Sequence, residues 1–172
     1  MKKEPSFEEA LNIASIWCIA WERGELSDEV LADRVSELLE TETGARGFFV
    51  ISLSGDFPLM DRIPDALLFK LIKSGEIVID LIVKNLAMST AMKVKHESDQ
   101  NFIQRDSSER IKQRCIELLK LLQPHLVKDR VEKLLNTING DGADDANFLK
   151  RWGFDIEQKK AIISSINAIA EH

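Results

Sequence analysis

Two opposite charges inside an apolar segment are the residues of this chain whose types and spacing best suit chemistry. Asp80 and Lys84 interrupt residues 76–96, where apolar side chains otherwise fall on every side of a helical wheel. Residues four apart share one face of a helix, so the two side chains can pair within an apolar environment. Together with His96, they are our candidates for an inter-helical binding site.

Other residue types that support chemistry are scattered along the chain. The three histidines are too few and too far apart in the sequence to suggest a catalytic array. The loop NGDGADD at 139–145, tested in the register of an EF-hand, places Thr137 and Phe148 where two essential calcium ligands belong. An acidic turn that caps a helix explains this loop better. We therefore expect no metal ion and no cofactor, and we assign no catalytic residue.

Two further positions are candidates for binding. Arg46 lies in the sequence GARG, which lacks the GK[ST] ending of a phosphate loop, although the arginine itself could contact an anion. Ile19 interrupts a face of the first expected helix that is otherwise polar. An apolar side chain on a polar face suits contact with a partner or with a second copy of the chain.

Charge is distributed unevenly along the chain. Residues 1–42 carry eleven acidic and four basic side chains, a balance of −7, whereas residues 93–133 carry seven acidic and ten basic ones, a balance of +3. Such regions can attract each other within one molecule or between copies. The total of −6 disfavours nucleic acid as a partner, since affinity for nucleic acid comes from neutralising phosphates.

Composition and cysteine usage indicate a globular protein of the cytoplasm. The chain has 172 residues, of which 44% are hydrophobic and 30% charged. Cys18 and Cys115 each fall in an apolar helical stripe, which predicts reduced core thiols. The first residues lack the order of a signal peptide. The charges within residues 77–92 argue against a membrane span.

Apolar periodicity and helix-capping signals predict an all-α fold. Ser6 and Glu9 form a capping box for a first helix that runs to Gly24, and Ser27 caps a second helix that Gly44 should end. We expect a single domain over residues 1–172, with about eight helices packed around a buried helix at 76–96. A polar connector at 97–107 should separate its N-terminal and C-terminal halves.

One segment can be interpreted in two ways. Residues 45–58 include FFVISL, which alternates well enough for a strand and could pair with the apolar run that follows residue 76. A minor two-stranded element from 48–53 and 77–83 is therefore the alternative. We favour helix or irregular buried chain, because the surrounding sequence is helical and a two-stranded sheet alone is marginal.

The function expected from these patterns is interaction rather than catalysis. We predict a non-enzymatic helical protein that acts through protein–protein contacts, as an adaptor, regulator or assembly factor, and that forms a homodimer. The alternative is an enzyme or small-ligand-binding protein with a site near Asp80, Lys84 and His96.

Overall fold

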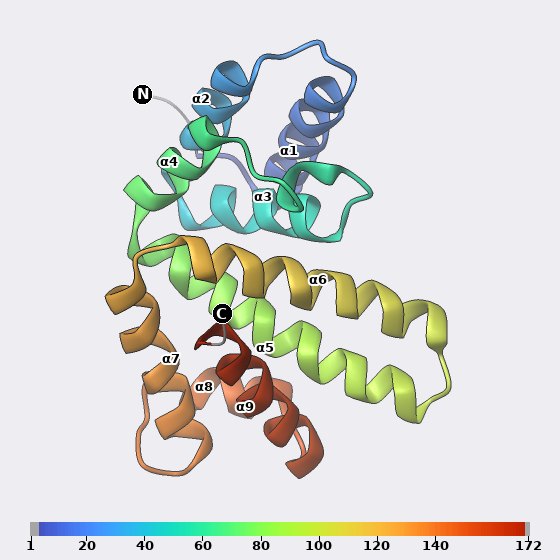
Figure 1. Cartoon of the computed structure of the whole chain (residues 1–172), viewed down its shortest axis with the longest axis vertical. Helices are drawn as coiled ribbons and strands as arrows, with labels where there is room; N and C mark the ends of the chain where they lie inside the picture. Colours follow the sequence, from blue (N-terminus) through green and yellow to red (C-terminus); the bar gives the residue numbers. More distant parts are fainter. Residues whose placement is uncertain (1–3, 171–172) are drawn as a thin grey trace. The chain divides into compact units, whose positions relative to one another are not determined.

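The computed structural model describes residues 4–170, and these residues confirm the all-α prediction (Figure 1). They form nine α-helices and a short 3-10 helix, η1. The elements are α1 (Phe7–Glu22), α2 (Asp28–Leu38), α3 (Glu42–Ser54), η1 (Pro58–Met60), α4 (Asp65–Ser74), α5 (Glu76–Ser98), α6 (Phe102–Leu121), α7 (Pro124–Ile138), α8 (Ala146–Trp152) and α9 (Ile156–Ala170). Within the described range, no helix is long and apolar enough to cross a membrane.

The chain divides into two compact units at a point inside α5. Unit 1 ends at Leu81 and holds α1 to α4, η1 and the start of α5, while unit 2 begins at Ile82 and holds the rest. The division does not fall at residues 97–107, most of which belong to α5 and α6. The single domain over residues 1–172 stays a prediction.

Side-chain caps define the helices of unit 1. The predicted capping box is present: the Glu9 amide donates to Ser6 Oγ and the Ser6 amide donates to Glu9 Oε1. Ser27 caps α2 as predicted. The expected end of the second helix at Gly44 is wrong, because α2 ends at Leu38 and Thr41 starts a new helix by accepting a hydrogen bond from the Gly44 amide.

Close contact between α1 and α3 dominates the packing of unit 1. Gly47 lies where a Cβ atom would come within 2.5 Å of the Ala10 Cβ atom, so the two small residues let the helix backbones approach. Phe48 and Phe49 are fully buried next to this crossing, with their rings edge to face at 5.1 Å. The core of unit 1 is therefore built on α3.

The alternative strand pairing of 48–53 with 77–83 is wrong, since both segments are helical. Residues 48–53 continue the helix that Thr41 caps, and 77–83 lie within α5. Short apolar runs look alike in buried helices and buried strands, and the cap supplies the information that alternation lacks.

The buried helix predicted at 76–96 is confirmed as α5, which extends to Ser98. Most of its side chains from Val78 to Ala91 are buried. The final turn carries Lys95 and His96, whose positive charge or polarity suits the negative end of the helix.

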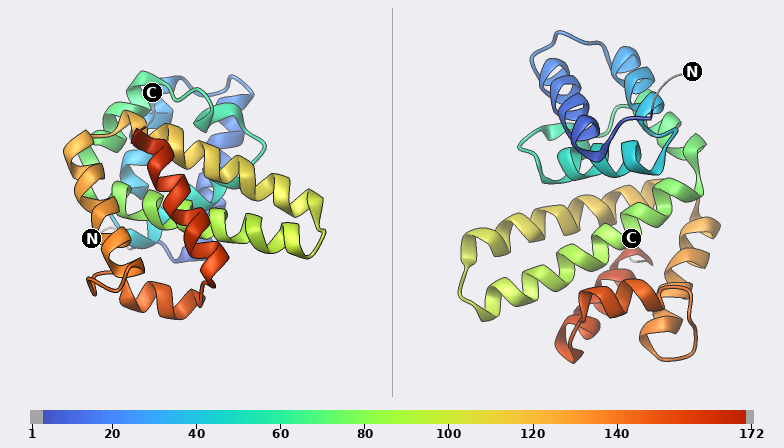
Figure 2. Two further views of the ribbon diagram at one scale, coloured as in Figure 1. Left: turned by 60° about the horizontal axis from the view of Figure 1, so that its bottom comes forward. Right: turned by 180° about the vertical axis from the view of Figure 1, so that it is seen from behind.

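In unit 2, α6 begins much earlier than the sequence suggested. We expected a polar connector up to residue 107, but Asn101 accepts a hydrogen bond from the Gln104 amide and starts α6 at Phe102. Only residues 99–101 separate α6 from α5, so the two helices form a tight hairpin (Figure 2). The last helix, α9, packs against α6 beside this hairpin.

A buried ion pair fixes the loop between α7 and α8. Arg130 on α7 donates two hydrogen bonds to the Asp145 carboxylate, at 2.9 and 2.7 Å, and the Asp145 side chain is only 5% exposed. The Asp145 amide also donates to Thr137 Oγ1 at 3.4 Å. Asp145 occupies the N-cap position of α8, but its side chain does not cap the helix as the loop pattern suggested.

Candidate functional site

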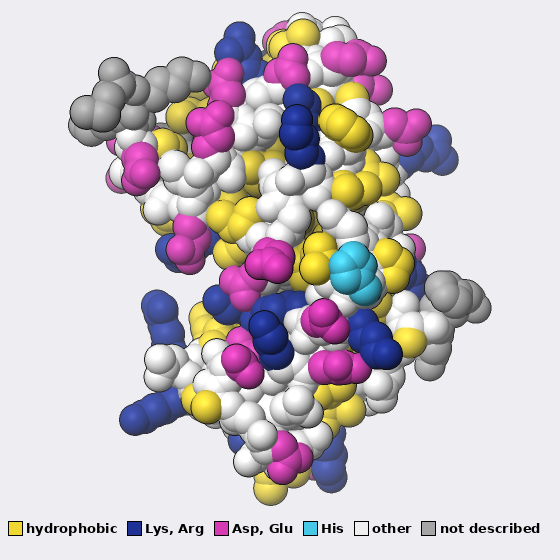
Figure 3. Space-filling model, turned by 90° about the vertical axis from the view of Figure 1, so that its left-hand side faces the viewer, with side chains coloured by type: hydrophobic (Ala, Val, Ile, Leu, Met, Phe, Trp, Pro, Cys, Tyr) yellow, Lys and Arg dark blue, Asp and Glu magenta, His cyan; other side chains and the backbone are white. Residues whose placement is uncertain are grey.

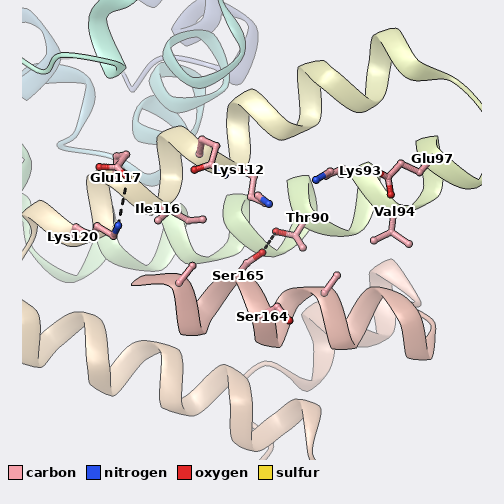
Figure 4. Close-up of a pocket in the computed structure, with 13 residues that line it drawn as sticks. Thr90, Lys93, Val94, Glu97, Lys112, Ile116, Glu117, Lys120, Ser164 and Ser165 are labelled. Atoms are coloured by element: carbon pink, nitrogen blue, oxygen red, sulfur yellow. Dashed lines mark hydrogen bonds and ion pairs between the residues drawn. The ribbon is translucent and has the colours of Figure 1, made fainter. Parts of the chain in front are cut away.

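A groove in unit 2 is the feature of the structure best suited to binding. It has a volume of about 640 Å³ and lies between the second half of α5, the middle of α6 and the face of α9 turned toward them (Figure 4). This volume falls within the usual range for ligand-binding clefts. The lining side chains come from Thr90, Lys93, Val94, Glu97, Lys112, Gln113, Ile116, Glu117, Lys120, Ala161, Ser164, Ser165 and Ala168.

Each helix contributes one stripe of side chains at helical spacing. The stripe of α5 follows Thr90 at three, four and seven residues, and the stripe of α9 follows Ala161 at the same intervals. Positions with this spacing share one face of a helix. Our sequence analysis missed these stripes, because each one alone resembles an ordinary half-polar helix face.

Three polar side chains converge on the carboxylate of Glu109 beside the groove. Lys93 Nζ on α5 and Lys112 Nζ on α6 lie 2.9 and 3.0 Å from the same oxygen, Oε2. Gln113 Nε2 donates to the other oxygen at 2.9 Å. One carboxylate thus binds two ammonium groups. Lys120 pairs with Glu117, and Glu97 also lines the groove, so its acidic and basic side chains, counted with Glu109, are equal in number.

The ionisation of Glu109 reflects these contacts. Burial raises the pKa of its carboxyl group, but hydrogen bonds from Gln113, Lys93 and Lys112 outweigh that effect and hold the pKa below its ordinary value. The carboxylate is therefore charged at neutral pH, and it keeps Lys93 and Lys112 side by side at the edge of the groove.

A pair of hydroxyl groups forms the base of the groove. Thr90 Oγ1 and Ser165 Oγ lie 2.9 Å apart, and these residues are 3% and 5% exposed. This hydrogen bond joins α5 to α9, and Gln158 Nε2 joins them again by donating to the Ala91 carbonyl oxygen at 3.1 Å. The two contacts fix the separation of the helices that form opposite walls.

Apolar side chains complete the walls. Val94 on α5 and Ile116 on α6 line the groove, and α9 contributes the small side chains of Ala161 and Ala168. Small residues on α9 leave room for an incoming group, and the lysines can hold a carboxylate next to it. The arrangement suits a ligand segment that combines an acidic and an apolar side chain.

The residues first predicted as an inter-helical site do not line this groove. Asp80 and Lys84 are half-buried near the start of α5, on either side of the division between the units. His96 is half-buried in the last turn of α5. The groove instead uses residues 90, 93, 94 and 97 of that helix. A site built from Asp80, Lys84 and His96 stays a prediction.

The other two candidates lie in unit 1. Arg46 is exposed on α3, with its guanidinium group 5.1 Å from the centre of the Phe7 ring, so it takes part in a cation–π contact. Ile19 is half-buried on α1, whereas Ile16, which our sequence analysis did not single out, is 60% exposed. Ile16 is thus the more accessible apolar side chain of that helix.

Neither a metal centre nor a reactive thiol emerges from the described part of the chain. No three His, Cys, Asp or Glu side chains there gather in a way that could hold a metal ion. Burial raises the pKa of Cys18 to about 12 and raises the pKa of Cys115 further. Both thiols therefore stay protonated at neutral pH and are poor nucleophiles.

A nucleic-acid interface would need an accessible face formed by the basic side chains of α6. Arg114 is only 4% exposed, and Arg105 stacks on Phe102 while pairing with Asp106. Lys112 faces the groove instead. These side chains therefore do not present one basic surface. On the face of the molecule drawn in Figure 3, charges of both signs and hydrophobic side chains reach the surface together.

Comparison with known proteins gives a family but no function. None of the curated proteins and none of the solved structures matches the chain. A family model does match, and it covers residues 6–169, which include every residue that lines the groove. The chain therefore belongs to the family described as uncharacterised conserved protein UCP020893.

Proposed function

We propose that this chain is a non-enzymatic interaction protein that binds an acidic segment of a partner protein in the groove between α5, α6 and α9. The observation that carries the proposal is that Glu109 holds Lys93 and Lys112 side by side at a groove that Val94 and Ile116 also line. A carboxylate of the partner replaces water at the two ammonium groups, and a neighbouring apolar side chain packs against Val94 and Ile116. This is the pattern of helix-in-groove and peptide recognition.

The chemistry of the lining supports binding over catalysis. Thr90 and Ser165 share one hydrogen bond, and neither of the two histidines that the structure describes lines the groove to act as their base. Lys93 and Lys112 are both held in ion pairs by the Glu109 carboxylate. Groups in these states fix and orient a ligand but do not activate a nucleophile.

The same proposal includes a homodimer that acts in the cytoplasm. Its support is that the first 42 residues have a negative net charge and residues 93–133 a positive one. Charge complementarity of this kind steers two copies toward each other and fixes their orientation. The two cysteines are free and buried, as suits a reducing compartment. Sedimentation velocity at micromolar concentration should show a dimer that weakens at high salt.

The groove can be tested without knowing the partner. A phage-displayed library of random 16-residue peptides is selected on the immobilised full chain. The enriched peptides should combine Asp or Glu with large apolar residues. Their affinity is then measured by fluorescence anisotropy against variants. Lys112→Glu should weaken binding at least about tenfold, because losing one charge-assisted hydrogen bond costs about 1.5–3 kcal/mol. Lys128→Glu, on the exposed surface of α7, is the matched control.

A variant that fills the groove without changing its charge tests whether the peptide needs the space there. Ala168→Trp should fill part of the groove and abolish peptide binding, whereas Ala170→Trp, which lies two residues further along α9 and does not line the groove, should leave binding unchanged. Equal binding of the selected peptides to the wild type, Lys112→Glu and Ala168→Trp would reject the groove as the binding site.

A further inference from the structure

The outer face of α4 carries a charge pattern that is symmetric about one exposed aromatic side chain. Phe69 is 62% exposed, and Asp65 and Lys73 lie four residues before and after it. Residues at this spacing share one face of a helix, and both charged side chains are exposed. Leu67 and Leu71 are fully buried on the opposite side, so they hold α4 in the core of unit 1 and turn Phe69 outward.

The two charged side chains of this face are available to a partner. Lys70, on the flank of α4, pairs with Asp33 on α2 at 3.4 Å. Among the residues that the structure describes, neither Asp65 nor Lys73 takes part in an ion pair. Their charges are therefore not already balanced by neighbours on the surface of the same molecule.

A second copy of the same face complements this pattern. When two identical helices pack antiparallel about a two-fold axis, each residue before the axis faces the residue equally far after it on the other copy. An axis at Phe69 brings Asp65 against Lys73 of the second copy twice, about 6 Å along the helix on either side of the stacked rings. Ala66 and Ile72, which are half-buried and three residues from Phe69, meet in the same way.

We infer that this face of α4 forms the homodimer interface, with a second copy of the chain bound across a two-fold axis at Phe69. The inference rests on the homodimer that the proposed function includes, and it names the surface that forms it. The helix α2 widens this surface, because it packs against α4 and carries Val30, which is 41% exposed three residues before Asp33. A contact between such short helices is small, which predicts a micromolar dissociation constant.

The symmetry of the contact permits a charge-reversal test by sedimentation equilibrium. Asp65→Lys brings positive charges together at both ends of the contact, so it should raise the dimer dissociation constant at least about tenfold. Lys73→Asp should do the same with negative charges. The double variant Asp65→Lys/Lys73→Asp restores opposite charges across the axis and should dimerise like the wild type. An equimolar mixture of the two single variants should dimerise as well.

The matched control is Glu42→Lys, because Glu42 is also an exposed acidic residue in the first turn of a helix of unit 1, α3. It belongs to the acidic first 42 residues, whereas Asp65 lies outside both charged regions. A dimer that Glu42→Lys weakens as much as Asp65→Lys does would assign the contact to the charged regions and overturn the inference. A double variant that stays monomeric with a native circular dichroism spectrum would overturn it too.

A last variant tests the centre of the contact. Phe69→Ser should make the chain monomeric and leave its helix content unchanged, because the side chain lies outside the core. A wild-type dimer that survives both Phe69→Ser and Asp65→Lys would reject this surface and keep the homodimer, whereas a monomeric wild type would reject both. Peptide binding in the groove should be unchanged in these variants, since α4 does not line it, so its loss or absence would count against the proposed function alone.

Discussion

The interiors of the two units differ in chemical character. Of the twelve largest fully buried side chains in the described residues, nine lie in unit 1, and Ser52 is the polar residue buried there. Unit 2 buries six polar or charged residues, which are Ser89, Thr90, Ser108, Arg114, Asp145 and Ser165. Unit 1 is therefore stabilised mainly by close apolar packing, whereas unit 2 also depends on polar groups that satisfy one another.

The two units also differ in net charge. Unit 1 has sixteen acidic and eight basic side chains, a balance of −8, and unit 2 has thirteen acidic and fifteen basic ones, a balance of +2. The polar interior and the excess of basic groups thus occur in the unit that holds the groove.

The largest expected effect concerns the polar interior of unit 2. Arg130→Met leaves the Asp145 carboxylate buried without its bidentate partner, which should reduce the free energy of unfolding by about 3–5 kcal/mol. Urea denaturation measures the change. The control is Lys160→Met, which removes an ion pair whose side chains are 70% and 74% exposed, and it should leave the midpoint unchanged. Similar midpoints for both variants would show that the polar interior contributes no stability.

The next largest effect should come from the apolar packing of unit 1. Gly47→Ala gains helix propensity, but its Cβ would lie 2.5 Å from Ala10 Cβ and 3.0 Å from Ala10 C, so α1 and α3 must separate. Overpacking of this kind typically costs about 1–3 kcal/mol. Gly142→Ala, in the loop between α7 and α8, is the matched control, because the added Cβ would come no closer than 3.3 Å to a neighbour, the Asn136 Cβ atom. A thermal midpoint for Gly47→Ala equal to that of the wild type would mean that the helices do not pack this closely.

A double-mutant cycle tests whether the hydroxyl pair of unit 2 acts as a unit. Thr90→Val leaves Ser165 Oγ buried without this partner and should cost about 1–3 kcal/mol. Adding Ser165→Ala should recover most of that loss, because both partners are then apolar. Thermal denaturation of the four proteins gives the coupling. Strict additivity would show that the two hydroxyl groups do not depend on each other.

The smallest effect concerns pH. The pKa of Glu109 is lowered in the folded state, so its contribution to stability is present above its unfolded pKa and is lost as the pH falls through the folded value. Glu109→Gln should therefore reduce the difference in urea midpoint between neutral pH and pH 3. Glu132→Gln, on the exposed surface of α7, should leave that difference as it is in the wild type. An unchanged pH dependence in Glu109→Gln would show that the lysines do not perturb this carboxyl group.

Local signals predicted the helices well and their ends less well. Ser6 and Ser27 begin α1 and α2 as expected, because a cap and the helix it starts are adjacent in sequence. Thr41 and Asn101 were missed, since the glycine three residues after Thr41 suggested a stop and the polar run around Asn101 suggested a connector. In both cases one side-chain hydrogen bond outweighed the composition of the segment.

The groove could not be predicted for a different reason. Thr90 and Ser165 are 75 positions apart, and their contact depends on how α5 and α9 pack. Sequence periodicity shows which residues share a face of one helix, but it does not show which faces meet. The charged segment 93–133 was identified, although the lysines that matter for the groove could be distinguished only once Glu109 was seen between them.

The small residues of α9 allow the free space in the groove to be reduced in steps. Ala161 and Ala168 stand on one wall, and each can be enlarged through valine and leucine to phenylalanine while the lysines remain in place. Each added methylene changes the free space by a known volume without altering charge. The size at which binding disappears at each position would therefore give the width of the occupant there. Such a series would give the approximate size of the binding segment at two positions before that segment is identified.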